Sequence, residues 1–265
     1  MKLLALALSL AAASAAPAAD LPALASASAL YAGGSYAEAT TAFEQLATLR
    51  PDDASVAFHL GKLAIHRRDY PAALDLLDRA AALSPRDSTI TLWLGNAHAW
   101  SASVAAGFTD RVRHGRRALT LYRRAVELDP ENVPARFALM NFCRHVPALA
   151  GGGLNRAHEQ VREIARRDAI TGAYALALLS FHERKFSATY DLIRRLLEKQ
   201  PQHYGANFLL GRLAAASGEH RDEGRAALRC CLARTPGEND DPHDEVRALL
   251  AQLETGGATT ATIAR

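Results

Sequence analysis

Apolar positions along this chain repeat on two scales. Within short stretches they follow the i, i+3, i+4 spacing of amphipathic helices, and the whole pattern returns about every 34 residues. The clearest copy runs from Ala54 to Asp87. In it, Gly61 and Ala73 would let two helices approach, Leu77 would fill the seam between them, and Pro85 would end the second helix. The pattern therefore predicts a helical hairpin.

Six such hairpins follow one another when the copies are aligned on the small residue near the start of the second helix. The predicted fold is all-α, a right-handed superhelix (α-solenoid) of about six helix-turn-helix units. A helix over residues 241–255 is expected to cap the array, and residues 256–265 are expected to be disordered. The array covers residues 19–240, with units at about 20–53, 54–87, 88–132, 133–169, 170–203 and 204–239.

Two units break the period. The third is longer by about eleven residues, close to three helical turns, so we expect its first helix to lengthen and its hairpin to protrude. The added residues are roughly Ser101 to Arg111. The fourth unit carries Pro147 and the triplet Gly151–Gly153 between its helices. Because proline and three glycines disfavour a helix interior, this segment is expected to be a flexible connector.

Over roughly residues 20–239 the chain resembles the tetratricopeptide repeat superfamily, most specifically in the second, third and sixth units. The stretch 135–140 (ARFALM), followed by Pro147 and Gly151–Gly153, also looks like a subgroup of exported bacterial members. The resemblance implies binding of a protein or extended peptide, and no catalysis. The fourth and fifth units depart from the family pattern, since no glycine follows Leu139 or Leu176.

The first eighteen residues have the pattern of a secretory signal peptide. Leu3–Leu10 is apolar, and Ala16-Pro17-Ala18 supplies small residues for cleavage. A membrane anchor is the alternative, but the apolar run is shorter than the roughly 20 residues that span a bilayer. We therefore expect an exported protein, most simply in a bacterial periplasm, cleaved near Ala18.

Composition excludes several classes of partner. The formal charge is +3 and acidic residues are interspersed with basic ones, so no basic stripe indicates nucleic acid. No segment after the signal peptide is apolar enough to span a membrane. The three cysteines, Cys143, Cys230 and Cys231, are few for a disulfide framework and are expected to be buried thiols.

A candidate binding face follows from the resemblance, because the first helix of each unit lines the concave surface in this family. Its side chains would form an aromatic column beside an Asn/Lys/Arg column, which suits a peptide. The aromatic residues could equally pack in the core, whereas mid-helix asparagines favour a binding role because Asn is a poor helix former. The candidate residues are Phe58, Lys62, His66, Asn96, Trp100, Phe137, Asn141, Arg144, Tyr174, Phe181, His182, Phe208 and Arg212.

Other chemistry finds little support in the sequence. The ten histidines show no HExxH spacing, although His98, His145 and His182 recur on successive first helices. We expect no metal, no cofactor and no catalytic residues. The leading hypothesis is a non-catalytic scaffold that binds a protein or peptide in its groove. The alternative is a small-molecule-binding component of a periplasmic uptake system, with Trp93 and Trp100 walling a pocket.

Overall fold

The computed structural model describes residues 21–238 and 240–255, and all regular structure within these ranges is helical. The all-α helical-repeat prediction is confirmed. The chain divides into two compact units, unit 1 from Met1 to Ser84 and unit 2 from Pro85 to Arg265. The predicted signal peptide and the predicted disordered tail lie outside the described residues.

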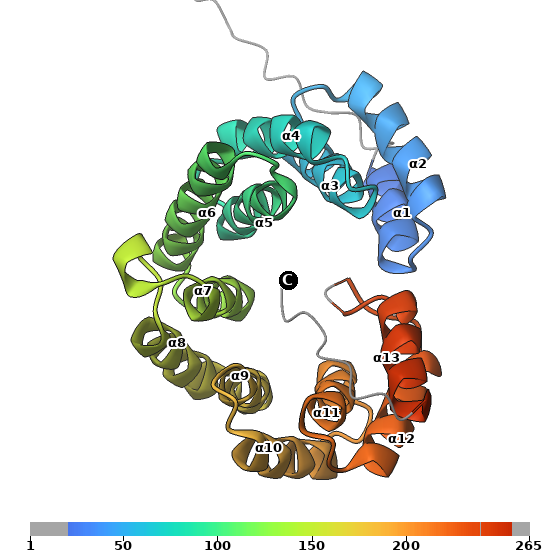
Figure 1. The fold of residues 1–265 in the computed structure, drawn as a ribbon. Helices are drawn as coiled ribbons and strands as arrows, with labels where there is room; N and C mark the ends of the chain where they lie inside the picture. The colour runs from blue at the N-terminus through green and yellow to red at the C-terminus, as the bar shows by residue number, and fades with distance from the viewer. Residues whose placement is uncertain (1–20, 239, 256–265) are drawn as a thin grey trace, which may run out of the picture. The chain divides into compact units, whose positions relative to one another are not determined.

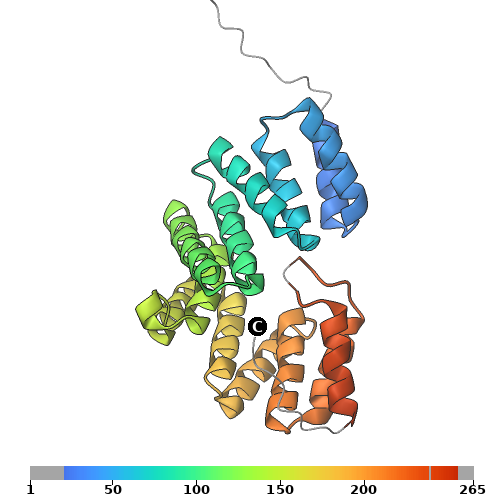
Figure 2. The same ribbon diagram turned by 45° about the horizontal axis from the view of Figure 1, so that its top comes forward.

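Unit 1 consists of two helical hairpins (Figure 2). Phe43 and Leu63 are among the side chains that fill its core. Asp53 and Asp69 cap the N-termini of the third and fourth helices by accepting hydrogen bonds from backbone N–H groups. The helices are α1 (Leu21–Ala32), α2 (Tyr36–Leu49), α3 (Ala54–His66) and α4 (Tyr70–Leu83).

Unit 2 holds four further hairpins and a final single helix. In Figure 1 the first helices of its hairpins form an inner layer and the second helices an outer layer. This alternation gives unit 2 an inner face made by α5, α7, α9 and α11. The helices are α5 (Ser88–Val104), α6 (Phe108–Leu128), α7 (Val133–His145), the 3₁₀ helix η2 (Ala148–Ala150), α8 (Leu154–Arg167), α9 (Ala169–His182), α10 (Phe186–Lys199), α11 (Tyr204–Ser217), α12 (Arg221–Leu232) and α13 (His243–Thr255).

A glycine in the first helix brings the two helices of a hairpin together. A Cβ added at Gly61 would lie 2.6 Å from Cγ of Leu77, and one at Gly211 would lie 2.5 Å from the same atom of Leu228. In the fourth hairpin, Met140 occupies the position of these glycines on the first helix. The shorter Val161 occupies the position of Leu77 and Leu228 on the second helix, α8. Both side chains are buried in one core cluster. The departure from the family pattern is therefore accommodated by a smaller side chain on the second helix.

In the long third hairpin the second helix is extended as well as the first, whereas only the first was expected to lengthen. Both helices are extended: α5 has 17 residues and α6 has 21, against 13 and 14 in α3 and α4. The turn falls within the added segment, at residues 105–107, so the extra turns are shared between the two helices. The Arg111 guanidinium donates to the carbonyl of Ala105, 3.1 Å away, at the end of α5.

The connector of the fourth hairpin has a defined hydrogen-bonded path. The N–H of Gly153 donates to the carbonyls of Cys143 (2.8 Å) and Val146 (2.7 Å), and that of Gly152 donates to Pro147 (3.2 Å). Gly151 and Gly153 adopt φ values of 93° and 103°, which side chains other than glycine rarely adopt. The connector expected to be flexible is thus a glycine-dependent turn.

Helix α13 packs against α11 and α12 through the buried side chains of Val246 and Leu253. It occupies the region for which a capping helix is expected. All three cysteines are free thiols, with Cys143 and Cys231 buried. Within the described ranges, every helix is too short or too polar to cross a membrane.

Candidate functional site

Five polar or aromatic residues lie on α7, α9 and α11, which lie side by side in the inner layer of unit 2 (Figure 1). We call them the inner cluster. Arg144 interacts electrostatically with Tyr174, His182 and Arg212, and Asn141 precedes it by three residues on α7. They are Asn141 and Arg144 on α7, Tyr174 and His182 on α9, and Arg212 on α11.

Arg144 is the most buried charge of the inner cluster. Its Nη1 donates to the Leu178 carbonyl at a long 3.4 Å, and its Nε is buried with no hydrogen-bond partner among the described residues. Burial, followed by the nearby positive charge of Arg212, lowers the pKa of Arg144 to about 10. The guanidinium is therefore still charged at neutral pH. A buried cation without an anionic partner is costly, and an anionic or strongly accepting group would stabilise it.

Asn141 lies one helical turn before Arg144, so the two side chains share a face of α7. Its Oδ1 is also buried without a hydrogen-bond partner in the described part of the chain. The pair thus offers one buried acceptor and one buried donor next to each other. A peptide group, which carries one N–H and one C=O, can satisfy both.

Aromatic rings border these polar atoms. Phe137 stacks on Tyr174, with ring centroids 5.9 Å apart and planes 11° from parallel. The Arg212 guanidinium lies 5.1 Å from the centroid of Phe181. Burial raises the pKa of Tyr174 well above its usual range, so its hydroxyl keeps its proton at neutral pH. The lining combines apolar surface with donors, as ligand sites in proteins do.

The two histidines of this face are neutral at pH 7. His145 and His182 lie 5.0 Å apart between ring centroids. Burial, together with Arg144, lowers the pKa of both, to about 4 for His145. His98, on the first helix of the preceding hairpin, instead contacts His114, with their Nδ1 atoms 3.0 Å apart. Within the described ranges, no three His, Cys, Asp or Glu side chains converge to hold a metal ion.

Asp241, in the loop before α13, is a neighbour of the inner cluster that the sequence analysis missed. Burial raises the pKa of its carboxyl to about 6, while the charge of Arg212 opposes this shift. Asp241 also interacts electrostatically with Tyr174. The loop carries no helical periodicity, so nothing in the sequence pattern pointed to it.

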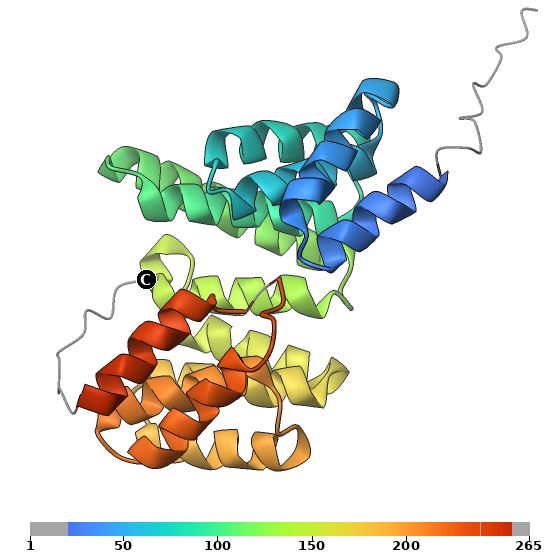
Figure 3. The ribbon, with the colours of Figure 1, turned by 90° about the vertical axis from the view of Figure 1, so that its right-hand side faces the viewer.

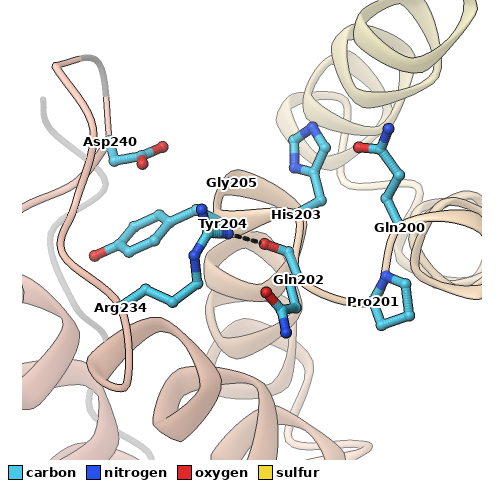
Figure 4. A pocket seen from close by; sticks show the side chains of 8 residues that line it. All are labelled: Gln200, Pro201, Gln202, His203, Tyr204, Gly205, Arg234 and Asp240. Atoms are coloured by element: carbon cyan, nitrogen blue, oxygen red, sulfur yellow. Dashed lines mark hydrogen bonds between the residues drawn. The ribbon is translucent and has the colours of Figure 1, made fainter.

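A hollow lies where α10 turns into α11 (Figure 4). Its volume is about 700 Å³, and Arg234 crosses it to donate to the backbone carbonyl of Gln202. His203, which caps α11, is part of this wall and also lies 5.0 Å from the Tyr174 ring between centroids. His203 is likewise absent from the predicted set, because it precedes the first helix rather than lying on it.

Two predicted residues of unit 2 have structural partners instead. Asn96 accepts a 2.9 Å hydrogen bond from the hydroxyl of Tyr122, which accounts for an asparagine in mid-helix without a ligand. Phe208 is buried, only 6% exposed, in the core beneath α13. Trp100 is 52% exposed near the turn of the third hairpin. Trp93, in contrast, is buried. The hypothesis of a small-molecule pocket lined by both tryptophans therefore gains no support.

The remaining predicted residues, Phe58, Lys62 and His66, belong to α3 of unit 1. The Lys62 ammonium lies 4.3 Å from the ring centroid of Tyr31 and 5.2 Å from that of Phe58. His66 stacks on Tyr36 with centroids 4.1 Å apart. These side chains therefore contact aromatic rings within their own unit.

Comparison with known proteins agrees with this architecture. The family model for the tetratricopeptide repeat matches residues 24–88. No curated protein matches the chain. A tetratricopeptide repeat protein from Parabacteroides merdae superposes with a TM-score of 0.70 at 12% identity, covering 91% of this chain and 86% of that one. A thermophilic TPR protein from Thermus thermophilus gives 0.64 at 20% identity, covering 74% and 97%.

The match to the repeat model falls on the hairpins of unit 1, whereas the similarity of fold extends over most of the chain. Both findings agree with the packing observed in the hairpins, where a glycine of the first helix lies against a large apolar side chain of the second helix. Residues 24–88 thus match the tetratricopeptide repeat family model, and the fold of the chain is similar to that of solved tetratricopeptide repeat proteins.

Proposed function

We propose that the protein is a non-catalytic scaffold that binds an extended segment of another protein along the inner face of unit 2. The observation that carries this proposal is the pair of buried, unpartnered atoms on α7, Asn141 Oδ1 and Arg144 Nε. Leaving such atoms unpaired costs about 1–3 kcal/mol each, and an extended backbone segment relieves both. The stacked rings of Phe137 and Tyr174 offer a flat apolar surface for a side chain of the bound segment.

A peptide array of random sequences, probed with the purified full chain, tests this proposal. We expect a subset of peptides to bind. For these, Asn141→Ala and Arg144→Lys should each weaken affinity by about tenfold, because each removes one half of the polar pair. Lysine keeps the positive charge but has no N–H donor at the place of the arginine Nε.

The matched control is Arg194→Lys on the outer helix α10, where the side chain is exposed and pairs with Glu198 at 3.7 Å. This variant should bind the same peptides with unchanged affinity. If all three variants bind equally well, or if no peptide binds the wild type, the inner face is not the binding surface.

We further propose that the chain is exported through its N-terminal segment. The support is the sequence of residues 1–18, with its apolar Leu3–Leu10 run and the small residues before Ala19. Mass spectrometry of the protein made in its native host measures the mature N-terminus. A chain that begins at Ala19 is expected, and recovery of the full-length chain from the cytoplasm would contradict export.

A further inference from the structure

Large apolar side chains are exposed at the turns of the two irregular hairpins of unit 2. Within the described part of this unit, every exposed large apolar residue lies at one of these two turns. The turns of the next hairpins are polar, with Arg184 and Lys185 in one and Glu219 in the other. We call the five residues the tip surface: Trp100 (52% exposed), Val104 (62%), Phe108 (77%), Leu149 (105%) and Leu154 (40%).

The two turns lie on the same edge of unit 2, because each joins a first helix to a second helix (Figure 3). The α6 side chain of Arg123 donates to the carbonyl of Gly151 in the α7–α8 connector, over 2.9 Å. Trp100 and Val104 are four residues apart and so share one face of α5. The tip surface therefore has two parts on this edge: the end of the extended hairpin, and the glycine-rich connector, which contacts α6 further along at Arg123.

Basic side chains accompany the tip surface. Between Ala97 and Val126 the only acidic residue is Asp110, and it pairs with Arg113 at 2.9 Å. Arg116 and Arg117 are exposed and have no ion-pair partner in the part of the chain that the structure describes. A shallow hollow of about 640 Å³ starts at Thr109, next to Phe108, and is lined by these arginines together with His98, Val112, Arg113, His114 and Thr120.

We propose that the tip surface docks onto a membrane of anionic phospholipids. The exposed apolar side chains would enter the interfacial region, and the arginines of α6 would contact lipid phosphates. Tryptophan is favoured at membrane interfaces, and arginine can extend its apolar stem while its charge stays with the phosphates. A basic surface near an anionic leaflet also gains electrostatic attraction for every cation it brings close.

The shape and charge of this edge favour a membrane over a protein partner. The apolar residues project from two turns rather than lining a cleft, which suits contact with a planar surface. The excess of arginine complements a surface of phosphates. This contact is separate from the inner cluster, since it uses the turn edge of unit 2 and not the α7–α9–α11 face.

Sedimentation with vesicles tests the proposal. The full chain without its signal segment is mixed with vesicles of phosphatidylcholine alone, or of phosphatidylcholine and phosphatidylglycerol in equal parts. We expect binding only to the anionic vesicles, weakened by added salt. Replacing Arg116 and Arg117 together by Ala should weaken binding by roughly tenfold or more, given the gain per basic residue near an anionic surface. Trp100→Ser with Phe108→Ser should weaken it as well, because the apolar anchors are lost.

Matched controls use the outer helix α10, where Arg194 and Arg195 are also exposed. The double replacement of these two by Ala should leave vesicle binding unchanged. In a Trp93→Phe background, emission from Trp100 should shift to shorter wavelength on anionic vesicles, which reports entry into the interface. The four substituted residues, Trp100, Phe108, Arg116 and Arg117, are all exposed, so the fold is expected to tolerate the changes.

Four outcomes would overturn the proposal. The anionic vesicles fail to bind the wild type. The α6 and α10 double variants lose binding equally, which would show unspecific charge attraction. Glycerol phosphate competes while Trp100→Ser with Phe108→Ser binds normally, which would show a small-anion site in the hollow instead. Self-association that depends on Trp100 and Phe108, without vesicle binding, would identify a protein contact and also contradict membrane docking.

Discussion

The hydroxyl of Tyr122 donates a hydrogen bond to Oδ1 of Asn96 across the third hairpin, over 2.9 Å. Tyr122 is 4% exposed, and burial raises its pKa well above the usual range, so it remains a donor at any physiological pH. Gly95, next to Asn96, makes this approach possible, because a Cβ there would lie 2.8 Å from the Tyr122 ring. One asparagine thus ties the long α5 to the long α6.

Removing either partner of this hydrogen bond should destabilise the protein. Tyr122→Phe leaves the Asn96 oxygen without its donor, and we expect a loss of about 1–2 kcal/mol in the free energy of unfolding. Asn96→Ala should cost a similar amount. The double variant should cost less than the sum, by about 0.5–1 kcal/mol, because both changes remove one interaction. Urea unfolding of the four proteins measures this coupling, and strictly additive losses would contradict it.

Glycine substitutions should have opposite signs at two helical positions. Gly61→Ala places a Cβ 2.6 Å from Cγ of the fully buried Leu77, so we expect a loss of about 2–3 kcal/mol from overpacking. Gly115→Ala lies in α6, where an added Cβ meets no atom within 4 Å. There alanine should stabilise the protein by up to about 1 kcal/mol, because it favours the helix. Equal effects of the two changes in thermal unfolding would contradict this account.

Much of this architecture follows from the spacing of apolar residues. The positions of Ala73, Leu77 and Pro85, repeated along the chain, predict helix pairs because each residue type has one steric role in a hairpin. The turn of the third hairpin was harder to place, since the residues around Ala105 and Gly107 extend two helical patterns equally well. The position of this turn depends on how α5 and α6 pack against each other, which the spacing of apolar residues along the chain does not show.

The candidate site was predictable in part. Asn141, Arg144, Tyr174 and Arg212 all lie on first helices at positions expected to face inward, and the structure brings Arg144, Tyr174 and Arg212 near one another. Asn96 occupies the same repeat position as Asn141 and Arg212, but its oxygen is paired with Tyr122, a partner that sequence spacing could not reveal. Asp241 reaches the cluster from a loop. Periodicity describes helix faces, so contributions from loops and pairings across hairpins escape it.

Stability should fall as the pH drops from about 6.5 to about 4. Burial lowers the pKa of both His98 and His145 to about 4, whereas in the unfolded chain it is about 6.5. The unfolded state therefore binds more protons in this range, which favours unfolding as the pH falls. His98 should contribute on the order of 1 kcal/mol, and the exposed His145 less, because solvent screens its charge. The raised pKa of Asp241, about 6, acts in the opposite direction, because there the folded state binds the extra proton.

Urea unfolding between about pH 7 and pH 4.5 checks these signs. Replacing His98 and His145 by Gln should flatten the loss of stability on acidification. Asp241→Asn should steepen it, since the compensating proton uptake is removed. An unchanged pH profile in the double histidine variant would show that other groups control acid unfolding.

The connector of the fourth hairpin should depend on glycine for a steric reason at Gly152. A Cβ there would lie 2.1 Å from the carbonyl oxygen of Val146, which accepts the hydrogen bond of Gly153. Gly152→Ala must therefore open the turn, and we expect a loss of about 3 kcal/mol or more. Gly218→Ala is the matched control, because its φ of 78° is strained for alanine while no atom lies within 4 Å. It should cost only about 1 kcal/mol. Urea unfolding with limited proteolysis at residues 147–153 measures both effects, and equal losses would contradict a dominant steric role for the contact with Val146.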